Sequence, residues 1–386
     1  MIPYGRQSIS QQDLAAVEAV LRSDYLTQGP AVPAFEEKLA GLCGASHAIA
    51  VNSATSALHI AYLALGVGPG DRVWTTPITF VASANAALYC GAEVDFVDID
   101  PGSYNMCARA LAEKLEQAAA AGTLPKLIVP VHLAGQSCDM AEIRALADRY
   151  GARVVEDASH AVGGHYRGEP VGNCRYSDIC IFSFHPVKIV TTGEGGMALT
   201  NDAALAQRMA LLRSHGITRD ADALQRPDEG GWYYEQQELG FNYRLTDVAA
   251  ALGSSQLDRL EQFIADRVRI ADRYDSMLAG LPLRTPRRSA DAASAWHLYV
   301  IRLNLAASTR SHREVFEDLR GAGIGVNLHY IPVYKQPYYR DLGFAEDYCP
   351  EAEAYYREAI SLPMFPALTA QQQDEVVAAV RSAVTG

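Results

Sequence analysis

Seven apolar segments of strand length recur between residues 47 and 200, and they alternate for the most part with segments of helical pattern. Their apolar runs are nearly continuous, which is typical of strands buried on both faces of a parallel sheet. Helices that connect parallel strands cover both faces, so the alternation predicts a three-layer α/β domain with a mostly parallel seven-stranded sheet. The expected strands are 47–51, 71–77, 93–99, 126–134, 153–157, 178–184 and 196–200, with helices at 54–65, 79–90, 107–121 and 139–150.

The segments outside this region predict how the rest of the chain is organised. A polar stretch at 218–238 reads as a long surface loop, and one long helix at 246–278 follows it as a connector between domains. We expect a large domain at 1–250, and the connector helix with a smaller C-terminal α+β domain at 251–386. The other expected elements are helices at 10–23, 33–43, 311–321, 349–360 and 369–384, and strands at 296–303 and 323–330.

Composition narrows the possible partners and the compartment. The formal net charge of -12 argues against non-specific binding to nucleic acid or to a membrane surface. The 7 cysteines are scattered and odd in number, which favours reduced thiols over a disulfide framework. The N-terminus lacks the apolar core of a signal peptide, and no run approaches the length of a membrane span. We therefore expect a cytoplasmic protein without a nucleic-acid or membrane partner.

The stretch 178–196 carries the most specific chemical signal. Its apolar first half reads as a buried strand that ends at His185-Pro186, because proline cannot donate to a strand ladder. Lys188 follows, and a glycine-rich return comes after it at 193–196. Burial at such a strand end would lower the pKa of the lysine amine, as in enzymes whose lysine bonds covalently to a carbonyl carbon. The alternative is an ordinary surface lysine on a loop.

Two further stretches point to the same edge of the sheet as Lys188. Residues 52–58 open a helix with small hydroxyl side chains, and such a helix start binds phosphate. Asp157 ends another apolar strand, where it serves either a ligand or the strand end as a cap. Thr55, Asp157 and Lys188 all fall at or just past strand ends, where open α/β sheets bind ligands. A phosphate site, an acid and a lysine together are what pyridoxal 5'-phosphate requires.

Four motifs in this order carry a family resemblance. They are Asn-Ser-Ala-Thr-Ser-Ala at 52–57, Glu-Asp-Ala-Ser-His-Ala at 156–161, Ser-Phe-His-Pro-Val-Lys at 183–188 with Thr-Thr-Gly-Glu-Gly-Gly at 191–196, and Asn-Tyr-Arg-Leu-Thr-Asp at 242–247. The chain resembles the DegT/DnrJ/EryC1/StrS sugar-nucleotide aminotransferases over nearly its whole length. That resemblance implies the aspartate aminotransferase-like fold type I, pyridoxal 5'-phosphate as cofactor, and a homodimer with composite active sites.

The resemblance also implies roles for individual residues. Lys188 would bind the cofactor covalently and shuttle a proton, and Asp157 would keep the pyridine nitrogen protonated. Phe80 could equally be a core residue, Ser183 an ordinary strand serine, and Arg244 either a partner for the ligand's charge or a solvated side chain. Many relatives have glutamine at the position of His160. The implied cofactor-binding residues are Ala54, Thr55, Phe80, Asp157, His160, Ser183, Lys188 and Asn242, with Asn242 reaching the site of the neighbouring subunit.

The family's substrates imply a nucleotide-linked keto sugar, with glutamate as the amino donor. Residues 2–7, 23–30 and 327–339 resemble the aminotransferases of pseudaminic acid biosynthesis, which act on UDP-2-acetamido-2,6-dideoxy-β-L-arabino-hex-4-ulose. The alternatives are a perosamine-type or 3-amino-sugar enzyme, or a non-catalytic cofactor-binding regulator, against which the retained Lys188 argues. By this resemblance the substrate-binding residues are Tyr4, Tyr25, Leu26, Thr27, Asn327, His329 and Tyr330.

Overall fold

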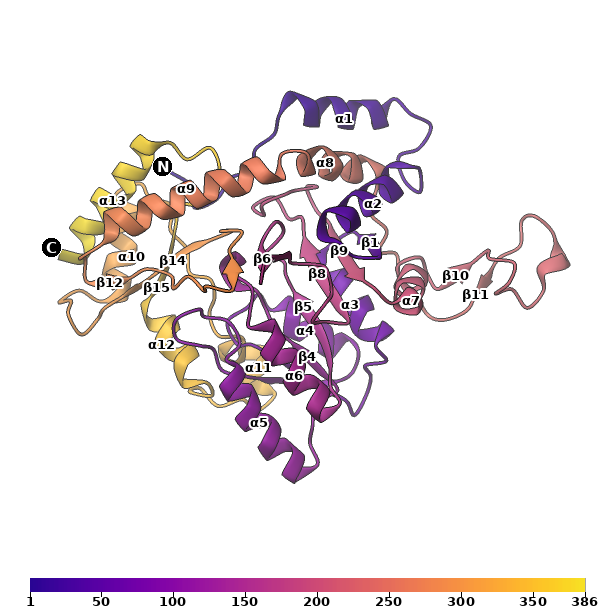
Figure 1. Ribbon diagram of the computed structural model, residues 1–386, viewed down its shortest axis with the longest axis horizontal. Helices are drawn as coiled ribbons and strands as arrows, with labels where there is room; N and C mark the ends of the chain where they lie inside the picture. The colour runs from indigo at the N-terminus through magenta and orange to yellow at the C-terminus, as the bar shows by residue number, and fades with distance from the viewer. Residues whose placement is uncertain (386) are drawn as a thin grey trace.

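A computed structural model describes residues 1–385 of the chain, and a seven-stranded sheet forms its centre (Figure 1). The strand order is β1-β9-β8-β5-β4-β2-β3, and neighbours run parallel except for β9, which is antiparallel to both β1 and β8. Every predicted strand of the large domain is present, so the predicted mostly parallel α/β sheet is confirmed. The strands are β1 His47–Val51, β2 Arg72–Thr75, β3 Glu93–Phe96, β4 Leu127–Val129, β5 Arg153–Asp157, β8 Ile179–Ser183 and β9 Gly196–Thr200.

Helices cover both faces of this sheet, and alternate strand residues pack against opposite layers. Val155 of β5 packs in the cluster that contains α3, α4 and α7, whereas its neighbour Val154 packs in the cluster of α5 and α6. The sequence analysis missed α7, whose side-chain cap is Asp202. The helices of these layers are α2 Ala31–Cys43, α3 Ala54–Ala64, α4 Ala82–Tyr89, α5 Ala108–Ala121, α6 Met140–Tyr150 and α7 Ala203–Arg213.

The single helix predicted at 246–278 is wrong, because the chain forms two helices, α8 Asp247–Leu257 and α9 Leu260–Leu278. The break at Arg259 allows its guanidinium to donate to the buried carboxylate of Asp13 in α1 Gln11–Leu21 over 2.5 Å. Ser255 and Gln256, at the end of α8, donate to the same carboxylate. Tertiary contact with α1 therefore accompanies the interruption, which the local helical pattern does not reveal.

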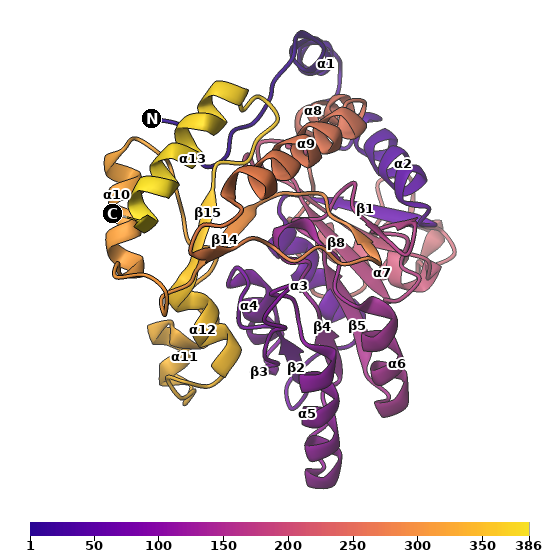
Figure 2. The same ribbon diagram turned by 60° about the vertical axis from the view of Figure 1, so that its left-hand side comes forward.

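The C-terminal part contains an antiparallel sheet of β12 Leu283–Arg284, β14 Tyr299–Leu303 and β15 Ala359–Leu362. The helices α10 His312–Gly321 and α13 Ala370–Thr385 lie together beside β14 and β15 (Figure 2). The predicted helix at 349–360 ends early, because α12 Pro350–Glu358 passes directly into β15. A short helix, α11 Pro337–Asp341, precedes α12. The division into domains at residue 250 stays a prediction.

The strand predicted at 323–330 is also wrong. This segment makes only isolated bridges, between Ile324 and Ile2 and between Asn327 and Ser361. It runs between the N-terminal residues and β15, so neither neighbour supplies a continuous ladder. The consequence is that the side chains of Asn327 and the residues after it are free to line a cavity instead of pairing in a sheet.

The predicted loop at 218–238 lies in a projecting hairpin with a short antiparallel pair, β10 Ile217–Thr218 and β11 Glu235–Gln236 (Figure 1). A second small sheet joins β6 His165–Tyr166, β7 Glu169–Pro170 and β13 Ala292–Ala293. None of the helices within residues 1–385 has the length and apolar character needed to cross a membrane.

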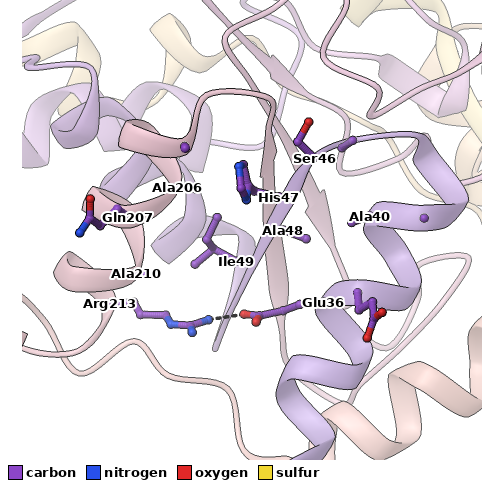
Figure 3. Close-up of a pocket in the computed structure, with 14 residues that line it drawn as sticks. Glu36, Ala40, Ser46, His47, Ala48, Ile49, Ala206, Gln207, Ala210 and Arg213 are labelled. Atoms are coloured by element: carbon purple, nitrogen blue, oxygen red, sulfur yellow. Dashed lines mark hydrogen bonds and ion pairs between the residues drawn. The ribbon is translucent and has the colours of Figure 1, made fainter. Parts of the chain in front are cut away.

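The outer edge of the central sheet is β1, and a groove between α2 and α7 runs beside it (Figure 3). An ion pair between Glu36 and Arg213 crosses this groove. The Glu36 carboxylate accepts a hydrogen bond from the N–H of Ala50 over 2.7 Å, and Arg213 donates to the carbonyl of Ala50 over 2.7 Å. The outward backbone groups of Ala50 are therefore bound within the chain.

Candidate active site

A cavity of about 860 Å³ lies at the carboxyl ends of the sheet strands and receives further walls from the C-terminal part. It brings together most of the residues predicted for the site, from segments far apart in the sequence. Four predicted residues, Tyr25, Leu26, Thr27 and Asn242, do not line the cavity of their own chain. The predicted residues that line it are Tyr4, Ala54, Thr55, Phe80, Asp157, His160, Ser183, Lys188, Asn327, His329 and Tyr330.

The start of α3 forms one end of the cavity. Ser53 caps the helix by accepting a hydrogen bond from the N–H of Ser56, so the helix begins at Ala54. The backbone N–H groups of Ala54 and Thr55 lie in the first helical turn, where no carbonyl of the same helix can accept from them. Strand β9 passes close beneath, because a Cβ on Gly196 would lie 2.6 Å from the nitrogen of Ala54. These residues fit a phosphate group at the helix start.

Asp157 ends β5 and is a buried residue, 5% exposed. Ser83 and Ser159 each donate a side-chain hydrogen bond of 2.6 Å to it, one to each carboxylate oxygen. Both hydrogen bonds fix the orientation of the side chain. The sequence prediction missed both serines, although Ser159 lies only two residues from Asp157. The carboxylate fits a protonated ring nitrogen of the implied cofactor.

Lys188 lies in the turn after β8, where its backbone N–H donates to the carbonyl of His185 over 2.9 Å. Burial lowers the pKa of the Lys188 amine from 10.5 to about 8, and the Asp157 carboxylate acts in the opposite direction. The shift makes the neutral, nucleophilic amine about 300-fold more abundant at pH 7 than for an ordinary lysine. The surface-lysine alternative does not describe this residue.

Three imidazoles form the opposite side of the cavity. The rings of His160 and His297 lie 4.4 Å apart, and His160 Nε2 is 3.3 Å from the hydroxyl of Tyr330. Burial, followed by the charge of Lys188, holds the pKa of His160 well below 6.5 and lowers that of His329 to about 4. These imidazoles are therefore neutral at pH 7 and act as hydrogen-bond partners instead of cations.

His297 is the main cavity residue that the sequence reasoning missed. It precedes β14 directly after Trp296, which adopts a left-handed backbone conformation with φ of 49°. No motif surrounds it, and the predicted strand at 296–303 gave it only a structural position. A histidine next to a residue in a strained conformation is recognisable from the structure alone.

Phe80 lies just before α4 and is 59% exposed, so the core-packing alternative for this residue is wrong. Its ring centroid lies 6.3 Å from that of Tyr330, across the mouth of the cavity. An exposed aromatic face in this position is available to stack on a planar ring.

The four predicted residues that do not line the cavity belong to two segments that contact each other, the loop at 25–27 and the segment 242–247. The N–H of Asp247 donates to the carbonyl of Leu26, and Thr27 bridges to Thr246. The carbonyl of Asn242 accepts a hydrogen bond of 3.3 Å from the side chain of Asn52, which itself lines the cavity. The loop at 25–27 and the segment 242–247 are therefore adjacent.

Comparison with known families identifies a match over almost the whole chain. The model of the DegT/DnrJ/EryC1/StrS aminotransferase family matches residues 7–381. Among curated proteins, the spore coat polysaccharide biosynthesis protein SpsC of Bacillus subtilis is 39% identical over 388 residues, covering 100% of this chain and 97% of SpsC.

Solved structures agree with that match. A Streptococcus pneumoniae protein provisionally described as a sugar aminotransferase, in its PMP form, has a TM-score of 0.91 and 30% identity, covering 100% of this chain and 99% of its own. Its PLP form has a TM-score of 0.89. Helicobacter pylori PseC, described as an aminotransferase of pseudaminic acid biosynthesis, has a TM-score of 0.90 and 32% identity, with 99% of each chain covered. PseC is thus one of several similar relatives and is not singled out.

Proposed function

Because this chain belongs to the DegT/DnrJ/EryC1/StrS aminotransferase family, we propose that it transfers an amino group from glutamate to a nucleotide-linked 4-keto-6-deoxy sugar. The coarser activity, that of a pyridoxal phosphate-dependent sugar aminotransferase, follows from the family and from relatives solved in PLP and PMP forms. The observation that carries the proposal is the half-buried Lys188, with the lowered pKa of its amine, in one cavity with the Asp157 carboxylate.

The cofactor, when bound, supplies an electron sink for the bonds at the amino carbon. The chain's own residues hold it and move protons. Nζ of Lys188 would hold it covalently and would carry a proton to and from the amino carbon, for which a pKa of about 8 is well matched. Asp157 would keep a proton on the ring nitrogen, the start of α3 would bind the phosphate, and Phe80 would supply an aromatic face for the ring.

The proposed substrate is UDP-2-acetamido-2,6-dideoxy-β-L-arabino-hex-4-ulose, which would give the 4-amino sugar of pseudaminic acid biosynthesis. The similarity to PseC and the cavity residues Tyr4, Asn327, His329 and Tyr330 support it, because aromatic rings and neutral polar groups suit a nucleotide sugar. The test is a panel of keto-sugar nucleotides, including perosamine-type and 3-keto substrates, incubated with glutamate and followed by mass analysis. Amination of a different panel member alone would overturn this substrate.

A homodimer with composite sites is part of the proposal. None of the described residues that line the cavity is an arginine, although a nucleotide diphosphate and glutamate both carry negative charge. Tyr25 and Leu26 are 55% and 50% exposed, which suits coverage by a second subunit. We assign the loop at 25–27 and Asn242 to the site of the neighbouring subunit on this basis.

Mixing two inactive variants tests the shared site. Lys188→Ala and Asn242→Ala homodimers should each be poorly active, and their dissociation and reassociation should restore up to about a quarter of wild-type activity per subunit. Statistical mixing puts half of the dimers in the mixed form, and each mixed dimer has one intact site of two. Reassociation of each variant alone is the control. No recovery would mean that Asn242 and Lys188 serve the same chain's site.

The lowered pKa of Lys188 predicts how cofactor binding depends on pH. Only the neutral amine attacks the aldehyde of pyridoxal 5'-phosphate, so the rate at which the apoprotein binds it should rise with pH, reach half of its maximum near pH 8 and level off above about pH 9. An ordinary lysine would still gain about tenfold between pH 8 and 9. Stopped-flow absorbance measures the rate, and a continued tenfold rise above pH 8 would contradict the assigned pKa.

A further inference from the structure

Arg267 is a buried cation without an acidic partner. It lies in the middle of α9 and is 1% exposed, and none of its contacts among the described residues is an ion pair. Its Nε has no hydrogen-bond partner. Burial lowers the pKa of the guanidinium to about 10, which leaves it charged at neutral pH. A buried charge without a partner of opposite charge costs free energy of folding, which points to a role for Arg267 beyond packing.

The contacts of Arg267 converge on two walls of the active-site cavity. Its Nη1 donates to the carbonyls of Trp296 over 3.0 Å, His297 over 3.2 Å and Met364 over 3.2 Å. The N–H of Met364 in turn donates to the carbonyl of Tyr4 over 2.9 Å. His297 and Tyr4 both line the cavity, so one guanidinium joins two chain segments that lead to it.

The wall of the cavity at Trp296 and His297 is also held by close packing against a second segment, at Gly135. Gly135 packs against it so closely that a Cβ there would lie 2.8 Å from the nitrogen of Trp296. The carbonyl of Gly135 accepts a hydrogen bond of 2.9 Å from Ala295. Trp296 itself holds a φ of 49°, a conformation that persists only when its surroundings fix it.

Besides burial, the charge of Arg267 also contributes to lowering the pKa of His297. Its Nδ1 is buried without a hydrogen-bond partner, and four groups face the ring: His160, Lys188, Arg267 and His329. Burial comes first, and the positive or potentially positive charge of all four then lowers the pKa of His297 further. Burial and these neighbouring charges together therefore keep the His297 imidazole neutral at pH 7.

We propose that Arg267 is a positioning residue for the substrate-binding wall of this cavity, acting through His297 and Tyr4. The inference rests on the proposed function for the identity of the substrate. It assigns to helix α9 a direct part in shaping the site, because the guanidinium binds the backbone carbonyls of Trp296 and His297 and that of Met364, whose N–H donates to Tyr4.

The matched control is Arg302, another buried arginine of the C-terminal part. It is 2% exposed in β14, but it pairs with Glu358 over 2.9 Å and donates to the carbonyl of Pro101, and neither of these partners lines the cavity. Arg267→Met and Arg302→Met should both lower the melting temperature. Only Arg267→Met should move the readouts of the site.

Two measurements decide the proposal. In ¹⁵N-histidine spectra of the apoprotein, which need no substrate, Arg267→Met should raise the pH at which His297 titrates, because a positive charge near the ring is removed. With the sugar nucleotide, its KM should rise about tenfold and kcat should fall less than threefold, because the wall is displaced while Lys188 is not. Arg267→Lys should keep the His297 titration and restore part of the KM.

An unchanged His297 titration in Arg267→Met, or equal effects in Arg302→Met, would overturn the proposal. If Arg267→Met does not fold, Arg267→Lys decides through KM: a wild-type KM would show that the wall does not depend on the guanidinium. Wild-type protein that aminates no member of the sugar panel would refute the proposed function, and the histidine titration would still report on Arg267.

Discussion

Replacing Lys188 with alanine should abolish turnover and leave the fold intact. The lysine is the covalent attachment point and the proton carrier in the proposed reaction, and loss of a proton-transfer group at such a site alone costs up to about 10⁴-fold in rate. We therefore expect kcat to fall by at least about 10⁴-fold. The turn that carries Lys188 is held by a backbone hydrogen bond to His185, which alanine retains. Steady-state kinetics and circular dichroism measure the two effects.

A second readout locates the cofactor. Borohydride treatment of the wild-type holoenzyme should fix the cofactor on the peptide that contains Lys188. Lys335 is the matched control, because its amine is held by the Glu353 carboxylate over 2.9 Å and does not line the cavity. Lys335→Ala should retain activity and labelling. Label on Lys335, or an active Lys188→Ala enzyme, would refute the assignment of the catalytic lysine.

Replacing Asp157 with asparagine should slow transamination by at least about 10³-fold, with only a modest loss of cofactor affinity. Asparagine keeps the shape and can still bond to the hydroxyls of Ser83 and Ser159. It removes the negative charge that keeps a proton on the ring nitrogen, and without that proton the ring withdraws electrons poorly. Single-turnover rates and fluorescence titration with the cofactor separate the two effects.

The comparison variant for Asp157 is Ser83→Ala, which deletes one hydrogen bond of 2.6 Å to the carboxylate and leaves its charge. We expect this variant to lose about tenfold in rate, in line with one charge-assisted hydrogen bond. A wild-type rate in Asp157→Asn would reduce Asp157 to a cap of the strand end.

The sequence predicted the central sheet because its strands are buried on both faces. Such strands are nearly continuous apolar runs, which can be recognised in the sequence without knowledge of their tertiary contacts. It failed where neighbours decide local structure. The break at Arg259 coincides with a tertiary hydrogen bond to the buried Asp13, and the segment 323–330 makes only isolated bridges to its neighbours. Helix α7 carries no clear apolar stripe, so its pattern gave no signal.

The same distinction applies to the site. Thr55, Asp157 and Lys188 were predictable, because each follows a buried strand and strand ends converge at one edge of the sheet. His297 and Arg267 were not, since their positions follow from the packing of helix α9 against a segment that carries no motif. The residues that the proposed reaction requires stand in recognisable sequence motifs, whereas the residues that hold the cavity walls in place do not.

The ion pair between Glu36 and Arg213 has a consequence for how this protein behaves when many copies are present. Sheet edges expose unpaired backbone groups that recruit strands from other molecules, and this is a route to aggregation. At the β1 edge the N–H and carbonyl of Ala50 already have side-chain partners. An incoming strand would have to break the ion pair before it could pair there. The two side chains therefore oppose aggregation through this edge of the sheet. They do so at a position outside the active-site cavity.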